Sequence, residues 1–319
     1  MVLPPRKYRD FVRSIAEQVI AVSSTLSTDY YEQVFVPSGL CLEKIKVSSV
    51  NAERYRVLGE EHLNEVLRSF EPHNQGHVDP VIYDRVGTKT GRLRVLSGPK
   101  ILTLPKDWRD LIVPRARSRV IAYVDLTALE ATFVLNKSGR NNICEGDVYS
   151  YVSKEVFDGR LPRDSAKALV LSRLYGSSAA SLAGKLSMSE EEAACVLSKV
   201  DTLMDIGTLS NKLWLEAQSG HIRNAFGRVL NVASGEAKHV VLNYYVQSSA
   251  VDVALTYFSE LIEQLEKEIV DAEPLFVLHD ALLLDVSLGS IERLEQLVAA
   301  WRSALGGLYR CKVTRLVVS

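Results

Sequence analysis

Hydrophobic positions recur every three to four residues in several stretches of the chain, which is the period of an amphipathic helix. The pattern predicts helices over residues 8–24, 51–70, 239–270 and 290–304, and a largely helical region over 145–218 that is interrupted near 159–162 and 176–178. The stretch 239–270 has the longest continuous apolar face, so we expect this helix to pack into the core.

Short segments rich in β-branched and aromatic residues lie between these helices and predict strands. They are residues 120–126, two hairpins at 221–232 and 275–286, and a final strand that begins at Cys311. Residues 71–115 form an irregular connector with many glycines and prolines. This order of elements favours the α+β class, with an antiparallel sheet and a helical insertion.

Composition narrows the class of protein. The 319 residues include 38 basic and 39 acidic side chains, and 47% are apolar, which excludes a disordered chain, a collagen-like chain and a coiled-coil rod. No apolar run reaches the roughly 18 to 20 residues of a membrane span, and the N-terminus lacks the apolar core of a secretory signal, so a cytoplasmic protein is expected. The four scattered cysteines predict neither disulfides nor a zinc site.

Basic residues are concentrated between Arg85 and Arg119, where ten of them stand against two acidic residues, a local balance of +8. Such a run usually forms a solvated face. Because it contains so few acids, it also fits a surface that follows the phosphates of a nucleic acid. Charge alone leaves both interpretations open.

Two isolated aspartates lie in apolar segments. Asp125 follows the strand-like run VIAYV, and Asp280 lies within LFVLHDALLLDV. Burying a carboxylate costs several kcal/mol unless a positive charge compensates it. A shared divalent cation would do so, since Mg²⁺ prefers oxygen ligands and two-ion sites catalyse phosphoryl transfer. Taken alone, two unrelated structural aspartates explain the pattern equally well.

The segment RDSAKALVLSRLYG places two cations on one helix face, because Arg163 and Lys167 are four residues apart. Two like charges repel each other unless they face an anion. A triphosphate is such an anion, since the guanidinium can bind it as a fork and the ammonium as a point charge. Tyr175, at the end of this helix, fits either a stacking contact with a base or sugar or a core position.

These segments resemble the polymerase domain of family A DNA polymerases, and the resemblance extends from Thr90 to the end of the chain. TGRL (90–93) resembles the primer–template element, VDLTALEATFV (124–134) motif A, RDSAKALVLSRLYG (163–176) motif B, and LHDA (278–281) motif C. Residues 220–230 and 243–252 resemble two further segments of the family. Six elements in the family's order are far more specific than any one of them.

The resemblance implies a role for individual residues. Asp125 and Asp280 would bind two Mg²⁺ ions. Arg163 and Lys167 would hold the phosphates of the dNTP, with Lys167 also protonating the leaving group, while Glu130 and Tyr175 would exclude a 2′-hydroxyl. The residues expected to contact primer–template DNA are Thr90, Arg92, Arg228, Asn243, Gln247 and His279.

The implied fold is a right-hand polymerase with an antiparallel palm sheet, helical fingers and a reduced helical thumb. We expect a reduced thumb or N-terminal helical region over residues 1–85, the first part of the palm over 86–150, the fingers over 151–219 and the second part of the palm over 220–319. About 85 residues precede TGRL, so no exonuclease domain is expected. A separate processivity, thumb or exonuclease subunit is then an expected partner, and the small size suits a phage polymerase in the host cytoplasm.

The sequence also departs from the family pattern. Ala281 replaces the second carboxylate of motif C, Tyr149 replaces a phosphate-binding histidine, and Leu171 replaces an aromatic residue. Slower or less processive synthesis is the expected result. The predicted function is template-directed addition of dNTPs to a primer 3′-hydroxyl by two-metal transfer. A single-subunit RNA polymerase or primase-like enzyme, or a catalytically retired DNA-binding subunit, are the alternatives.

Overall fold

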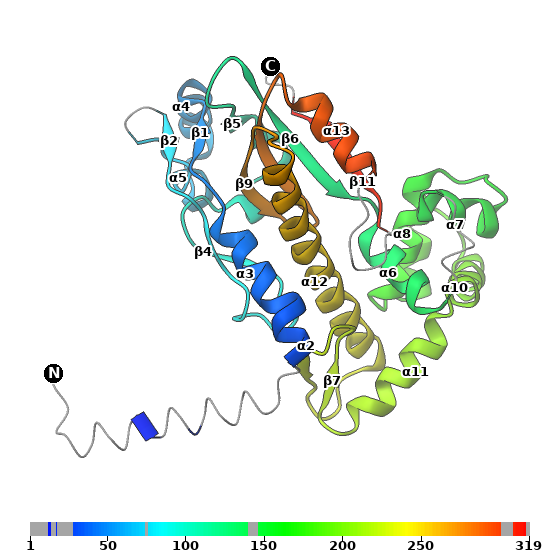
Figure 1. Ribbon diagram of the computed structural model, residues 1–319. Helices are drawn as coiled ribbons and strands as arrows, with labels where there is room; N and C mark the ends of the chain where they lie inside the picture. The colour runs from blue at the N-terminus through cyan, green and yellow to red at the C-terminus, as the bar shows by residue number, and fades with distance from the viewer. Residues whose placement is uncertain are drawn as a thin grey trace.

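The computed structural model of the chain describes residues 12–13, 17, 28–73, 76–139, 146–300 and 309–316. The helix predicted over 8–24 lies almost entirely outside these ranges, as do the last residues of the helix predicted over 290–304 and of the C-terminal strand. The described elements combine helices with antiparallel strands (Figure 1), which confirms the α+β class.

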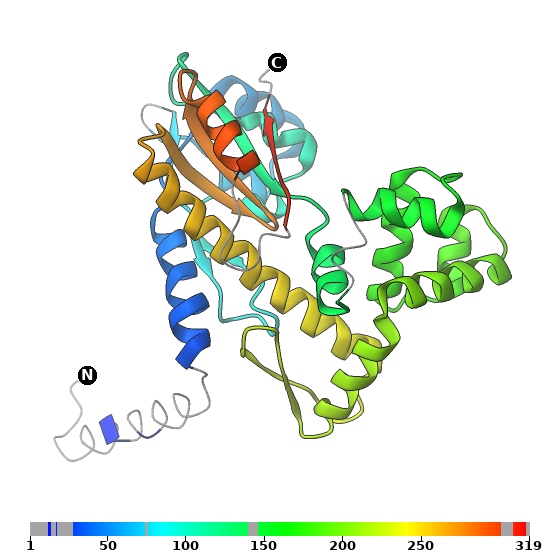
Figure 2. The ribbon, with the colours of Figure 1, turned by 45° about the vertical axis from the view of Figure 1, so that its right-hand side comes forward.

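A four-stranded antiparallel sheet in the order β11-β6-β10-β9 forms the centre of the fold. Its strands are β6 (Arg119–Leu126), β9 (Ala272–Leu278), β10 (Ala281–Ser287) and β11 (Cys311–Arg315), as predicted for 120–126 and for the hairpin at 275–286. Every residue of β10 except the last is buried, because both faces of the sheet are covered. Figure 2 shows α12 (Lys238–Lys267) and α13 (Ile291–Ala300) in front of the sheet.

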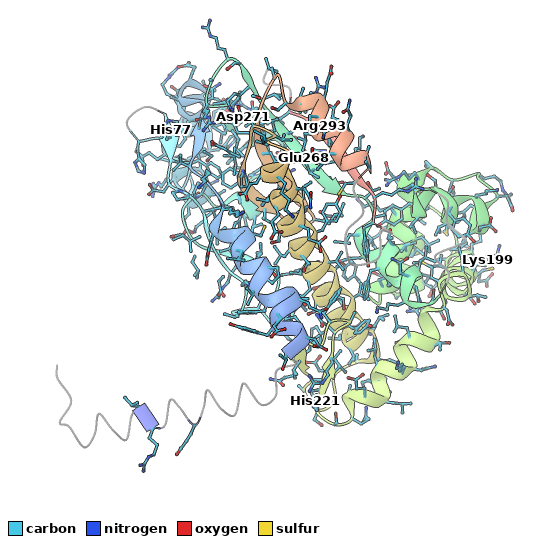
Figure 3. All side chains as sticks on the ribbon, in the orientation of Figure 1. His77, Lys199, His221, Glu268, Asp271 and Arg293 are labelled. Carbon is cyan, nitrogen blue, oxygen red and sulfur yellow. The ribbon has the colours of Figure 1, made fainter. Side chains whose placement is uncertain are left out.

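The 30-residue helix α12 joins two hydrophobic cores. Its first turns, from Val241 to Val246, pack into a helical core, and its later turns, from Ala250 to Leu265, pack into the core of the sheet. Its C-terminal end is fixed by an ion pair between Glu268 and Arg293 of α13 (Figure 3). Among the described residues no helix, α12 included, is long and apolar enough to cross a membrane.

The helical region predicted over 145–218 forms a lobe beside the sheet (Figure 1). It contains α7 (Val148–Phe157), α8 (Arg163–Leu174), α9 (Ala179–Leu186), α10 (Glu190–Met204) and α11 (Ile206–Ala217), and α6 (Leu129–Lys137) and the hairpin of β7 (His221–Arg223) and β8 (Val229–Asn231) join its core. The breaks predicted near 159–162 and 176–178 are confirmed. Side-chain caps at Asp147, Ser178 and Ser189 begin α7, α9 and α10.

The single helix predicted over 51–70 is wrong. The structure has two helices there, α4 (Ala52–His62) and α5 (Glu65–Arg68). The backbone of Leu63 is extended, and the side chain of Asn64 accepts a hydrogen bond from the N–H of Leu67. Asparagine is a strong N-cap, so it starts a new helix where the apolar periodicity continues without a break.

The described part of residues 1–85 contains strands as well as helices. The segments α2 (Thr28–Tyr30), η1 (Tyr31–Phe35) and α3 (Val36–Glu43) run on as one helical stretch that contacts α12. Strand β1 (Ser48–Val50) pairs with β2 (His77–Val78) and with β5 (Ile112–Val113). Strand β3 (Ile82–Asp84) pairs with β4 (Arg94–Ser97), and the 3-10 segments η2 (Ile101–Thr103) and η3 (Lys106–Leu111) follow. The expected boundary at residue 85 therefore falls inside a hairpin.

Candidate active site

A cleft of about 870 Å³ lies where the core of the sheet meets the core of the helical lobe. Nine of the twelve residues predicted for the site line it, and they come from both lobes. They are Arg92, Asp125, Glu130, Arg163, Lys167, Tyr175, Gln247, His279 and Asp280. Thr90, Arg228 and Asn243 do not line it.

The two aspartates are brought together by strand pairing. Asp125 is the next-to-last residue of β6 and lies opposite Ala281 of β10, so Asp280 is its diagonal neighbour. The N–H of Leu126 donates a 2.9 Å hydrogen bond to the carbonyl oxygen of Asp280, which fixes this end of the sheet. Burial, and next the charge of Asp280, raises the pKa of Asp125. Burial is also the main cause that raises the pKa of Asp280, and the charge of Glu130 adds to it.

The chemistry of this pair fits a magnesium ion that is shared with a substrate. Within the described ranges, no group of three or more His, Cys, Asp or Glu side chains gathers as a complete protein cage for a metal. Mg²⁺ commonly binds through one or two carboxylates together with substrate phosphates and water. Two half-buried carboxylates whose pKa values are raised by burial have the chemistry to serve as such a partial ligand set.

The cations of α8 line the wall of the cleft on the side of the helical lobe. Arg163 is the first residue of α8 and Lys167 lies one turn later, so both side chains are on the same side of the helix. Lys167 is exposed and forms no hydrogen bond or ion pair with any described residue. Its charge, like that of Arg163, acts to lower the pKa of Asp125, so the cations and the aspartates act across the same cleft.

Glu130, Tyr175 and Arg92 form a hydrogen-bonded chain across the cleft. The hydroxyl of Tyr175 donates to Oε2 of Glu130, and Nη2 of Arg92 donates to Oε1 over 3.2 Å. Burial and the charge of Glu130 raise the pKa of Tyr175, so its hydroxyl stays protonated as a donor. Both carboxylate oxygens of Glu130 are therefore engaged, and its side chain is held in one position between α6 and the end of α8.

The remaining predicted DNA contacts lie in different environments. Gln247 of α12 lines the cleft, and so does His279, which occupies the β9–β10 turn with φ of 57°. Asn243 lies one turn before Gln247, and its Oδ1 atom is buried with no hydrogen-bond partner in the described part of the chain. Thr90 is only 8% exposed. Contact with DNA by these residues remains a prediction.

Arg228 lies in a buried ion pair instead of on the cleft wall. Its side chain is 12% exposed and donates 2.9 and 3.3 Å hydrogen bonds to Asp252 of α12, which is itself buried. Asn224 donates a further 2.6 Å hydrogen bond to Asp252. A Cβ atom at Gly91 would come within 2.5 Å of the Arg228 guanidinium, so the Arg228 side chain packs directly against the backbone of the TGRL segment.

The close approach of Gly91 to Arg228 gives a stability prediction. Gly91 has φ of 76°, and Gly139 has a similar φ of 70° but no described atom within 4 Å of an added Cβ. We expect Gly139→Ala to lower the free energy of unfolding by about 1 kcal/mol, the cost of the left-handed backbone alone. Gly91→Ala should lower it by about 2 kcal/mol, because overpacking adds to that cost. Denaturant unfolding measures both, and equal losses would contradict the proposed close contact.

The basic run from Arg85 to Arg119 does not form an open cationic surface. Six of its ten basic residues are in ion pairs: Lys89 with Glu236, Arg92 with Glu130, Arg94 with Asp84, Lys100 with Glu65, Arg115 with Glu273, and Arg119 with Asp271 and Asp285. Arg85 is buried over the ring of Phe35. All of these acidic partners lie outside the run, so a count along the sequence overstates the local charge.

Comparison with known proteins places this geometry in a family. A sequence profile of DNA polymerase family A matches residues 50–306, which is most of the chain. The chain belongs to DNA polymerase family A. It is 25% identical over 246 residues to DNA polymerase I of Bacillus caldotenax, covering 68% of this chain and 28% of that protein. It is 24% identical over 251 residues to DNA polymerase I of Caldicellulosiruptor bescii, covering 69% of this chain and 29% of that protein.

A solved structure has the same fold. The polymerase domain of Pol1 from M. smegmatis, in complex with DNA primer–template and dNTP, aligns with a TM-score of 0.65 at 20% sequence identity. The alignment covers 83% of this chain and 55% of that one. The family A chain spans less than a third of the length of the two curated relatives.

Two residues of this family A chain that the sequence did not single out lie close to the site. Asp147, at the start of α7, binds Arg163 through hydrogen bonds of 2.9 and 2.7 Å. Lys312 of β11 lies opposite Asp125 across the sheet, and its charge acts to lower the pKa of Asp125. A cross-strand position could have been inferred for Lys312 only with the order of the strands known.

Proposed function

We propose that this family A chain is a DNA-directed DNA polymerase that adds dNTPs to the 3′-hydroxyl of a primer. The observation that carries the proposal is the pairing of Asp125 and Asp280 in a cleft whose opposite wall presents Arg163 and Lys167. Carboxylates on one wall and cations on the other suit a triphosphate whose reacting phosphorus lies between them.

In this proposal the elements have the layout of a right hand. The four-stranded sheet with α12 and α13 serves as the palm, and α7–α11 serve as the fingers. The stretch α2–η1–α3 along α12 is the described part of a short thumb. The two hydrophobic cores meet at the cleft, and such a junction allows the fingers to close over a nucleotide. A separate processivity subunit that strengthens binding to the duplex is part of the proposal.

The side chains have separable tasks in the proposed reaction. Arg163 binds the triphosphate as a fork, and Lys167 binds it as a point charge and donates a proton to the leaving pyrophosphate. The free ammonium of Lys167 supports this role, because no described carboxylate competes for it. Asp125 and Asp280 would hold two Mg²⁺ ions. When bound, these ions would lower the pKa of the primer hydroxyl and neutralise the pyrophosphate.

Primer extension tests the proposal. The purified chain is given a primed DNA template, Mg²⁺ and either dNTPs or NTPs. Extension of the primer with dNTPs, copied from the template, is the expected result. Preferential use of NTPs would favour an RNA polymerase or primase-like enzyme. Binding of the primed template without extension, even with an added processivity protein, would favour a retired DNA-binding subunit and contradict the proposal.

A further inference from the structure

Asp147 connects the starts of two helices at the edge of the cleft. Asp147 is the N-cap of α7: its Oδ2 atom accepts a 2.8 Å hydrogen bond from the N–H of Ser150 and a 2.9 Å hydrogen bond from the hydroxyl of Ser150. The same carboxylate accepts two hydrogen bonds from Arg163, the first residue of α8. The guanidinium of Arg163 and the capping bonds hold the pKa of Asp147 below its usual range. A single charged carboxylate therefore joins α7 to the residue predicted to bind the nucleotide phosphates.

The geometry leaves one edge of the guanidinium available. Asp147 binds the edge formed by Nε and Nη2, and the Cζ atom of Arg163 lies 5.1 Å from the centroid of the Tyr149 ring. Among the described carboxylates, only that of Asp164 lies near Nη1, at 4.0 Å, and its side chain is 93% exposed. A guanidinium fixed along one edge and over one face can turn only its remaining edge toward an anion in the cleft.

The orientation of the Arg163 guanidinium matters more for binding a triphosphate because residue 149 is a tyrosine. Tyrosine is neutral here, since burial raises the pKa of its hydroxyl, so position 149 supplies no positive charge to a triphosphate. Among the described residues of α7 and α8 that line the cleft, the cations are Arg163 and Lys167. No residue in the described part of the chain pairs with Lys167, so Arg163 is the one of these two cations whose direction the structure determines.

We propose that Asp147 is a positioning residue for dNTP binding that acts through Arg163. It would hold the Nε and Nη2 edge of the guanidinium so that Nη1 faces the triphosphate, and so lower the entropy that the side chain loses on binding. The proposal rests on the proposed function, because it takes the ligand of Arg163 to be a nucleoside triphosphate.

Two variants separate this role from helix capping. Asparagine and serine cap helices as well as aspartate does, so Asp147→Asn and Asp147→Ser should keep α7 and the melting temperature. Both variants lose the two charged hydrogen bonds between the Asp147 carboxylate and the Arg163 guanidinium, and serine is also too short to reach Arg163. We expect KM for dNTP in primer extension to rise about tenfold for Asp147→Ser and somewhat less for Asp147→Asn, with kcat changed less than about twofold. Unchanged KM in both variants would overturn the proposal.

A double-mutant cycle tests whether the effect passes through Arg163. In an Arg163→Ala background, Asp147→Ser should change KM by less than about twofold. A tenfold rise in that background would show an independent role and overturn the proposal. The matched control is Asp158→Asn, at the other end of α7, where the aspartate pairs with exposed Arg160. We expect no change in KM for it.

Titration of dATP into the chain without primer distinguishes failure of this inference from failure of the proposed function. An inactive wild-type chain that binds dATP about tenfold more tightly than Asp147→Ser would contradict the polymerase function but support the role of Asp147. If the wild-type chain is active and Asp147→Ser has the same KM and the same dATP affinity, the result would contradict the positioning role alone. A wild-type chain that neither extends a primer nor binds dATP would contradict both.

Discussion

Replacing Asp125 or Asp280 by asparagine is expected to reduce primer extension about a thousandfold. The amide keeps the size of the carboxylate but loses the negative charge that would hold a divalent cation in the proposed reaction. A bound cation supplies several kcal/mol of transition-state stabilisation, and about 4 kcal/mol corresponds to three powers of ten in rate. Single-turnover extension of a primed template at saturating dNTP and Mg²⁺ measures the loss.

The same substitutions should not destabilise the fold. The pKa values of both aspartates are raised, which means that the folded protein, without a cation, disfavours the two charges in this buried place. A neutral side chain removes the desolvation cost and the repulsion between the two carboxylates. We therefore expect melting temperatures equal to or above that of the wild type, measured without Mg²⁺. Loss of activity with retained stability is typical of functional residues whose charge is held in the folded protein at a cost in stability.

Asp107→Asn is the matched control for these variants, because Asp107 is an exposed aspartate on η3 and does not line the cleft. It should leave both extension and melting temperature unchanged. Extension by Asp125→Asn or Asp280→Asn within about tenfold of the wild type would contradict the assignment of a catalytic cation to this pair. A large fall in melting temperature would instead indicate a structural role.

Local patterns predicted the parts of the fold that depend on neighbouring residues. The hairpin that contains Asp280 and the long helix α12 were predicted within a few residues, since their periodicity is continuous and a turn or break bounds them. The apolar surroundings of Asp125 and Asp280 left their meeting as one of two interpretations, and the family resemblance favoured it. The two aspartates meet because β6 pairs with β10. This pairing joins segments far apart in the sequence, and no local pattern predicts it.

Charge partners were the features that the sequence could not predict. Arg228, which is predicted to contact DNA, pairs in the structure with Asp252, 24 residues away on α12. Six of the ten basic residues between Arg85 and Arg119 pair with carboxylates, one of them as distant as Asp285. Such pairs form because the fold brings buried or half-buried charges together, and the cost of leaving a charge unpaired selects the partner. Neither spacing nor composition carries that information.

Substituting Glu130 by alanine is expected to reduce discrimination against ribonucleotides about a hundredfold. Glu130 is held by Tyr175 and Arg92 at the wall of the cleft, so its side chain occupies a fixed volume there. A 2′-hydroxyl placed against this wall would meet a carboxylate that cannot move. Losing a factor of one hundred corresponds to about 2.7 kcal/mol, the size expected for admitting one extra hydroxyl. The measurement is the ratio of kcat/KM for dNTP to that for the matching NTP.

Two graded variants identify which property of the wall matters. Glu130→Gln keeps the bulk and an oxygen that accepts from the Tyr175 hydroxyl, so it should retain most of the discrimination. Tyr175→Phe keeps the ring but removes the hydrogen bond that fixes Glu130, so we expect a loss of about tenfold. In all three variants kcat/KM for dNTP should change only a few-fold, because the change concerns the rejected substrate. Unchanged discrimination in Glu130→Ala would show that ribose is excluded elsewhere, and a wild-type ratio near one would remove the argument for DNA over RNA synthesis.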